Sequence, residues 1–184
     1  MSSFKIVLAS IIFVYAISGA GEISTPESIP VTVEAEGLPF AFVSAYSNVF
    51  VLDFRGSVVE ILDDKPEGLI EIIGIGAVHS TEGEQLRVHA IDEGRLRHMQ
   101  NILTAFFETG IGDNVTFLDM TNIAQISFDY TDNFLVLLGS ADNLMRKLHT
   151  LSGAIVEIDY LFGQDASGII DLNEPMIARF IWSD

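Results

Sequence analysis

The sequence predicts an α+β fold, with a bent, mixed but mainly antiparallel β-sheet covered by two helices and preceded by a hydrophobic N-terminal segment. Short apolar runs alternate with polar turns over most of the chain, which is typical of strands. Two segments instead place their apolar residues at helical spacing. With 184 residues, 49% of them hydrophobic and 19% charged, the chain is long and apolar enough for one globular domain, with or without a small appendage.

The apolar segment at residues 6–20 predicts export. Lys5 precedes it, and no acidic residue appears before Glu22. Its length of about 15 residues lies between that of a signal-peptide core and that of a bilayer span. We therefore expect residues 1–21 to be a signal anchor or a signal peptide, with a buried core element as the alternative. The predicted location is the cell membrane, in a single pass with the C-terminal domain outside the cytoplasm, or secretion if the segment is cleaved.

Strands are expected to follow in close succession. Residues 22–37 are a polar linker with one short strand at 29–33, which Pro30 restricts to a sheet edge or to its first position. Turn residues then separate four apolar segments. A meandering antiparallel sheet is the arrangement that short strands and frequent turns favour. The four predicted strands are 38–43, 49–52, 57–62 and 69–74.

The first helix is predicted over residues 92–108. Met99 and Leu103 belong to its apolar stripe, Asp92 is at the N-cap, and Gly110 is where a left-handed C-terminal cap is wanted.

Residues 114–151 are predicted to form the nucleus of the domain, a hairpin that leads into a second helix. Residues 123–130 alternate between apolar and polar, and 134–138 are continuously apolar. Ser140 is the expected N-cap of the helix, and its buried stripe is formed by Leu144, Leu148, Leu151 and Ile155. The last strands are expected at 169–172 and 176–182.

The composition excludes several classes of function. A net charge of −17 is incompatible with a basic surface that neutralises nucleic-acid phosphates, and it offers no attraction to an anionic membrane. The absence of cysteine excludes disulfides and a thiol nucleophile. The histidines lack metal-ligand spacing, and the carboxylates stand in no catalytic motif. No enzyme activity, metal, cofactor, nucleic acid or small-molecule substrate is expected. The four histidines considered as metal ligands are His79, His89, His98 and His149.

The C-terminal strand is the exception. It is expected at an edge of the sheet, where unpaired backbone groups can accept a strand from a partner, and Arg179 alone protects that edge. Ala178, Phe180 and Trp182 share one face of the strand, and Trp182 is a suitable binding anchor. The alternative is that Phe180 and Trp182 close the core.

Several runs of this sequence resemble one known family. They are FVLDFRGSVVEIL, KPEGLIEIIG, NIAQISF followed by NFLVLLGS and NLMRKL, and GIIDLNEPMIARFIW. In order and spacing, residues 26–182 resemble the β-domain of the bacterial cell-division protein FtsQ, called DivIB in Gram-positive bacteria. The resemblance assigns residues 38–184 to this β-domain and residues 22–37 to a linker with the last strand of a POTRA module. The chain departs from the family upstream, where too few residues precede the β-domain for a full POTRA module.

The resemblance implies a non-enzymatic divisome scaffold in septum formation. Its partners would be the bitopic division proteins of the FtsB (DivIC) and FtsL types, and the N-terminal segment would contact the membrane. Two alternatives are a secreted binding module of unknown ligand and a cell-wall or carbohydrate hydrolase that uses a carboxylate pair. Carried over by position, the partner-binding residues are Glu174, Ala178, Arg179, Phe180 and Trp182.

Overall fold

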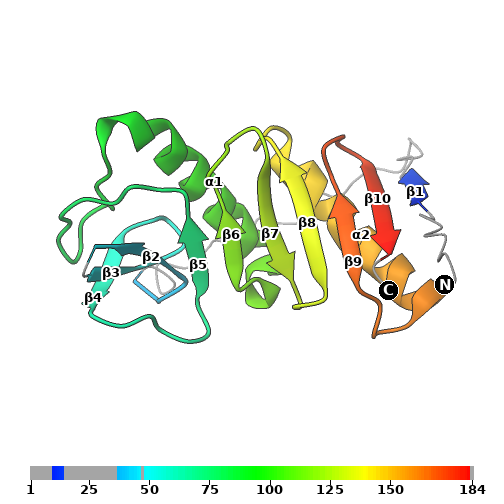
Figure 1. Cartoon of the computed structure of the whole chain (residues 1–184), viewed down its shortest axis with the longest axis horizontal. Helices are drawn as coiled ribbons and strands as arrows, with labels where there is room; N and C mark the ends of the chain where they lie inside the picture. Colours follow the sequence, from blue (N-terminus) through cyan, green and yellow to red (C-terminus); the bar gives the residue numbers. More distant parts are fainter. Residues whose placement is uncertain (1–9, 15–36, 47, 183–184) are drawn as a thin grey trace, which may run out of the picture.

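The computed structural model describes residues 10–14, 37–46 and 48–182, and for residues 10–14 it describes the backbone alone. These residues form an α+β fold in which two helices cover one face of a mostly antiparallel sheet (Figure 1). The sheet strands are β1 (Ser10–Val14), β2 (Ala41–Ala45), β3 (Asn48–Leu52), β4 (Val58–Leu62), β5 (Ile70–Ile73), β6 (Phe117–Asp119), β7 (Ile126–Tyr130), β8 (Phe134–Gly139), β9 (Gly168–Asp171) and β10 (Ile177–Trp182). The helices are α1 (Glu93–Thr109) and α2 (Leu144–Phe162), and the short 3-10 turns η2 (Ala90–Asp92) and η3 (Ile111–Asn114) flank α1.

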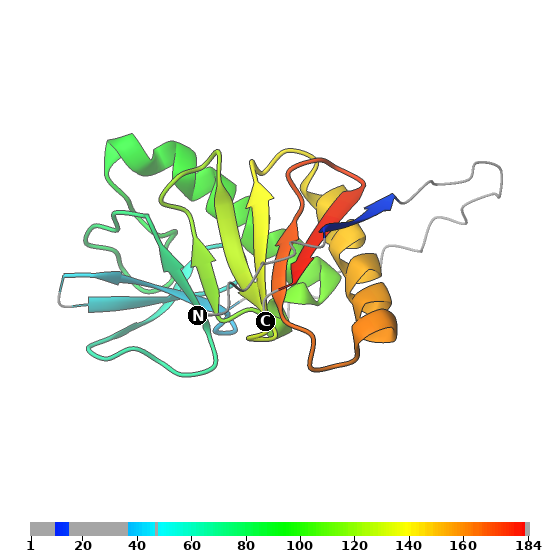
Figure 2. The same ribbon diagram turned by 45° about the vertical axis from the view of Figure 1, so that its right-hand side comes forward.

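The strand order is β1-β10-β9-β8-β7-β6-β5-β2-β3-β4. Three neighbouring pairs, β2 with β5, β5 with β6 and β8 with β9, are parallel, and the others are antiparallel. Parallel neighbours need a long crossover, which α1 supplies between β5 and β6 and α2 between β8 and β9. Figure 2 shows that β2 and β3 are turned away from the direction of β6 to β8, so the sheet is bent.

The core lies between the sheet and the two helices. Met99, Ile102 and Phe106 of α1 are fully buried, and the ring of Phe106 lies 4.9 Å from that of Phe128 in β7. Leu151 and Ile158 are fully buried on α2. The predicted helical stripes therefore face the sheet, because each helix can cover its apolar side only there.

The N-termini of both helices differ from the prediction. Asp92 occupies the N-cap position of α1, but its carboxylate accepts hydrogen bonds from the Gly76 amide at 3.1 Å and from Arg95 Nη1 at 2.5 Å instead of capping the helix. The second helix begins at Leu144, after the left-handed residue Asn143, so the prediction of Ser140 as its cap is wrong. The Asp92 carboxylate thus links the start of α1 to Gly76, in the segment that follows β5.

A buried lysine explains why α2 begins late. Lys147 is 2% exposed, and its Nζ donates hydrogen bonds to the carbonyl oxygens of Leu138 at 2.7 Å and Ser140 at 2.9 Å. The end of β8 is therefore tied to α2, and residues 140–143 form a bend and a turn, with Asn143 left-handed, before the helix begins. At the other end of α1, Gly110 has φ 70° and forms the predicted left-handed C-cap.

The N-terminal predictions are only in part within the described residues. The strand predicted at 29–33 lies outside them, as do residues 6–9 and 15–20 of the apolar segment. Ser10–Val14, in the middle of that segment, forms the strand β1.

Candidate functional site

The hairpin of β9 and β10 brings the polar members of the predicted site together on the face of the sheet without helices. The Arg179 guanidinium is hydrogen-bonded to the Glu174 carboxylate, and its Nη1 lies 3.8 Å from Asp171 Oδ2. Hydrogen bonding to Glu174 raises the pKa of Arg179 further above its ordinary value. Asn173 donates its backbone amide and its side-chain amide to Asp171 Oδ1, at 2.8 and 2.7 Å. The cluster contains two carboxylates, those of Asp171 and Glu174, and one cation, Arg179, so its net charge is negative.

The apolar members of the predicted site divide by burial. Ala178 and Phe180 are 0% and 1% exposed and belong to the core under α2. Trp182, on the same face two residues further, is 42% exposed, and its ring lies 5.2 Å from that of Phe162 at the end of α2. Ala178 and Phe180 are thus placed to shape the strand, whereas Trp182 offers side-chain surface to another molecule.

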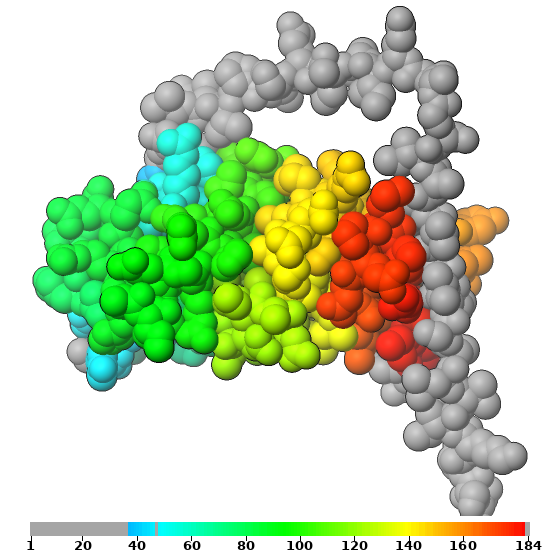
Figure 3. All heavy atoms as spheres, turned by 90° about the horizontal axis from the view of Figure 1, so that it is seen from above, coloured from blue at the N-terminus to red at the C-terminus, as the bar shows by residue number. Residues whose placement is uncertain are grey.

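The last turn of α2 extends the surface around Trp182. Tyr160, Leu161 and Phe162 are 87%, 51% and 36% exposed. Large apolar side chains scattered singly on a surface need no explanation, but three in the last turn of α2, one of them with its ring 5.2 Å from that of Trp182, favour an interaction site. We call Tyr160, Leu161, Phe162 and Trp182 the apolar end. In Figure 3 the last turns of α2 and the β9–β10 hairpin lie at the end of the molecule opposite the turns around β3 and β4.

A hollow on the outer side of α2 adjoins the apolar end. Its volume is about 520 Å³, and it is lined by Gly153, Val156, Glu157 and Tyr160. Val156 is 71% exposed there. The lack of a side chain at Gly153 and the nearby Val156 make this part of α2 suitable for close packing of another apolar element.

The outer edge of β10 carries a strand of the same chain. β1 pairs with β10 antiparallel, with Ser10 opposite Ile181 and Val14 opposite Ile177 (Figures 1 and 2). The prediction that the C-terminal strand is a bare sheet edge is therefore wrong, since β10 has a neighbour on each side. The pairing also shows that the backbone of β10 can hold an antiparallel strand on that side.

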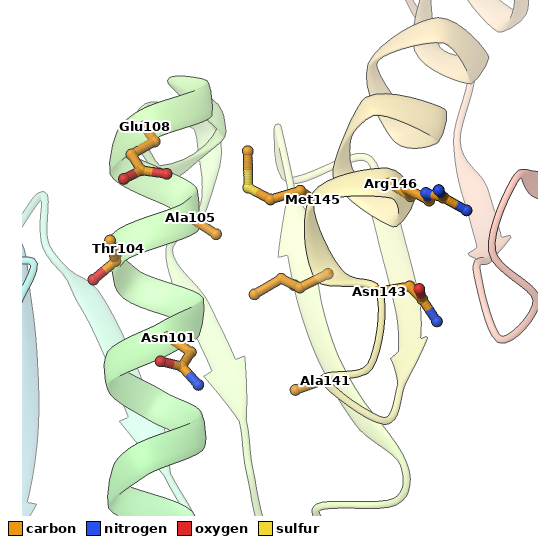
Figure 4. Close-up of a pocket in the computed structure, with 9 residues that line it drawn as sticks. Asn101, Thr104, Ala105, Glu108, Ala141, Asn143, Met145 and Arg146 are labelled. Carbon is orange, nitrogen blue, oxygen red and sulfur yellow. The ribbon is translucent and has the colours of Figure 1, made fainter. Parts of the chain in front are cut away.

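A second concavity lies between the helices. The groove of about 490 Å³ between α1 and the start of α2 is lined by residues of both, and Ala105 and Met145 point into it, whereas Asn143 and Arg146 point away (Figure 4). Glu108, its one carboxylate, has no partner acid in the lining. The groove offers an apolar floor but no set of groups for acid–base chemistry.

Other candidate chemistry is sparse among the described residues. Two further hollows have volumes of about 250 and 330 Å³, and none of these four hollows is lined by more than one carboxylate. His79 and His89 line the smaller one with Tyr46. In the part of the chain that the structure describes, no three acidic, histidine or cysteine side chains converge as a metal site would need.

The sequence could have revealed the apolar end only through the length of α2. The predicted helical stripe ends at Ile155, but α2 continues to Phe162. Tyr160 and Leu161 lie off the buried stripe, so their exposure follows once the helix is extended. The available signal was that residues 154–162 contain neither glycine nor proline, so nothing stops the helix before Gly163.

Comparison with protein-family models gives no match to this chain, and no curated protein matches it significantly. Within the described residues, no helix combines the length and hydrophobicity that crossing a bilayer requires.

Proposed function

We propose that this protein is a scaffold that binds other proteins by strand addition at β10 and by contact with its apolar end. The particular scaffold that fits its sequence is one of the FtsQ/DivIB kind, acting in bacterial septum formation. Its partners would be FtsB/DivIC-type and FtsL-type bitopic division proteins. In this proposal residues 6–20 export the domain and tether it to the membrane.

One observation carries the proposal: exposed aromatic and aliphatic side chains lie directly beside a strand whose outer edge holds another strand. Trp182 and Phe162 are 42% and 36% exposed, and their rings lie 5.2 Å apart, tilted by 53°, at the end of β10. Strand addition derives affinity from backbone hydrogen bonds and specificity from neighbouring side-chain pockets. The β10 backbone and the apolar end supply these two parts side by side.

The burial pattern supports a different role for each residue of the site. Ala178 and Phe180 would hold β10 against α2, so that its backbone is fixed when a partner binds. Trp182 would be the side-chain anchor, because tryptophan at a partly exposed position contributes strongly to interfaces. Arg179 is already paired with Glu174 and Asp171, so a partner strand should place a neutral or basic residue, not an acidic one, beside this cluster.

Binding can be measured with the full chain in phosphatidylcholine nanodiscs and the soluble extracytoplasmic domains of its own organism's FtsB- and FtsL-type proteins. We expect Trp182→Ala to weaken binding about thirtyfold or more, because hot-spot aromatic residues contribute about 2 kcal/mol or more. Tyr46→Ala is the matched control, since Tyr46 is fully exposed at the tip of the β2–β3 hairpin, far along the sheet from β10. The control should bind as the wild type does.

Failure of the wild-type protein to bind either partner would contradict the division role. It would favour the secreted binding module of unknown ligand, which uses the same surface. The hydrolase alternative gains no support from the hollows described above, because a carboxylate pair that shares a cleft is what it requires.

A further inference from the structure

The outer edge of β10 is occupied by residues that the sequence assigns to export. β1 comes from the apolar segment 6–20 and runs antiparallel to β10 over five paired positions. Both ribbon views place the two strands side by side (Figures 1 and 2). The same edge is the place where a partner strand would add.

The composition of β1 suits that edge. On β10, Ile177 and Ile181 are half-buried on one face, and Ala178 and Phe180 are buried on the other. A strand added there lies next to apolar residues on both faces of the sheet, so an apolar sequence is favoured. The sequence of β1, SIIFV, contains one polar residue among five. A covered edge also avoids the aggregation that an exposed apolar edge strand promotes.

A bilayer competes for the same residues. A segment within the hydrocarbon must satisfy its backbone hydrogen bonds internally, so residues 10–14 cannot be inserted in a membrane and paired with β10 at once. The 22 residues from 15 to 36 reach at most about 75 Å when fully extended. This length leaves room for the segment to leave β10 while the domain stays near the membrane surface.

We propose that residues 10–14 are a built-in cover of the β10 edge, which is released when the apolar segment enters a bilayer. Partner binding is then coupled to membrane insertion, since the edge is free for a partner strand only after release. The release into a bilayer and the coupling to a partner rest on the proposed function, whereas the cover itself does not.

The cover can be tested by residue-resolved amide hydrogen exchange of the full chain in aqueous buffer. In an antiparallel sheet, alternate amides of β10 point to β9 and to β1. The double variant Ile12→Pro, Phe13→Pro removes backbone donors from β1, and Ile12→Val, Phe13→Leu is the matched control that keeps an apolar strand. We expect the amides of β10 that point away from β9 to exchange at least tenfold faster in the proline variant than in the wild type. In the control variant they should exchange at the wild-type rate. Equal exchange rates in wild type and proline variant would overturn the proposal.

Release is tested by adding phosphatidylcholine bicelles to the wild-type protein. The same outward amides should then exchange at least tenfold faster, while those bonded to β9 keep their protection. Unchanged exchange in bicelles would refute release by the membrane.

A third measurement separates this inference from the proposed function. In buffer, the soluble FtsB- and FtsL-type domains should bind the proline variant about tenfold more tightly than the wild type. Equal, measurable affinities would rule out competition between β1 and the partner. If exchange responds as expected but neither form binds the domains, the cover stands and the proposed division role fails.

Discussion

Phe180 and Trp182 lie on the same face of β10, but they differ in burial. Phe180 is 1% exposed, with its ring 6.1 Å from Phe134 and 5.6 Å from Phe162. Trp182 is 42% exposed, and its ring lies 5.2 Å from that of Phe162 and 6.1 Å from that of Phe180. Stability should therefore depend on Phe180, and recognition on Trp182.

Phe180→Ala is predicted to lower the free energy of unfolding by about 3–5 kcal/mol, because it removes a buried ring and leaves a cavity. Trp182→Ala should lower it by only about 1 kcal/mol. Urea unfolding of the two variants checks both values. Equal losses of stability would show that Trp182 is as much a core residue as Phe180. A charged residue at 180 would unfold the domain and could not test binding.

Lys147 is the second residue whose environment makes a sharp prediction. Burial lowers the pKa of Lys147, while the charges of Asp142 and Asp171 oppose that shift. Its ammonium group satisfies two carbonyl oxygens, those of Leu138 and Ser140. Lys147→Met leaves these oxygens without a donor and should cost about 2 kcal/mol.

The pH dependence of that cost has a definite sign. Below its lowered folded-state pKa, Lys147 is protonated in both the folded and the unfolded chain, so its contribution does not change with pH. Between that pKa and 10.5, the ordinary pKa of a lysine side chain, the unfolded chain binds more protons at this position, so the contribution of Lys147 to stability rises with pH. The difference in unfolding free energy between wild type and Lys147→Met, from urea unfolding at increasing pH, should therefore grow toward pH 10.5. A shrinking difference would contradict a lowered pKa.

At the scale of elements, the close approach of β9 and β10 depends on Gly168. A Cβ atom added at Gly168 would lie 2.3 Å from the carbonyl oxygen of Ile181. Gly168 is also opposite Trp182 in the antiparallel register. Any side chain there must push the end of β10 away from β9.

Gly168→Ala should therefore destabilise the protein by about 2 kcal/mol and shift the resonances of Trp182. Gly94→Ala is the matched control, because nothing lies within 4 Å of an added Cβ in this position of α1. Alanine is the better helix former, so this control should gain up to about 1 kcal/mol. Thermal unfolding measures the change in stability of the two variants, and NMR spectra measure the shift of the Trp182 resonances. Unchanged Trp182 resonances in Gly168→Ala would argue against tight β9–β10 packing.

The elements were largely predictable because each depends on local periodicity. The apolar stripe of α1, the Gly110 cap and the continuous apolar run of β8 are all local signals. The start of α2 was not predictable, because Ser140 satisfies the local rule for a cap while Lys147 binds the Ser140 carbonyl from a later turn. The sequence around a buried lysine does not indicate which carbonyl oxygens its ammonium group will bind.

The candidate site was predictable in part, for a similar reason. Alternation along 176–182 separates the two faces of β10, but burial of Phe180 and exposure of Trp182 depend on where α2 ends. The cover by β1 depends on a pairing between opposite ends of the chain, which local patterns do not specify. Parallel pairing of β8 with β9 likewise follows from the path of α2 over the sheet.

For the molecule as a whole, the net charge and the exposed apolar side chains favour the apolar end as the region of association. The chain has a net charge of −17, which disfavours non-specific association between copies. The apolar end is a local exception to that acidic character at one end of the bent sheet. A specific partner should therefore bind there through apolar burial, with backbone pairing at β10.

Trp182 is the only tryptophan in the sequence, so it reports on this region without interference from the rest of the chain. The most direct test uses full-length protein labelled with 5-fluorotryptophan in phosphatidylcholine nanodiscs. Unlabelled FtsB- and FtsL-type extracytoplasmic domains are added, and the single ¹⁹F resonance is followed while binding is measured separately. We expect a shift of the Trp182 resonance that saturates with the binding curve. Binding that leaves this resonance unchanged would place the partner elsewhere and contradict the assignment of function to β10 and the apolar end.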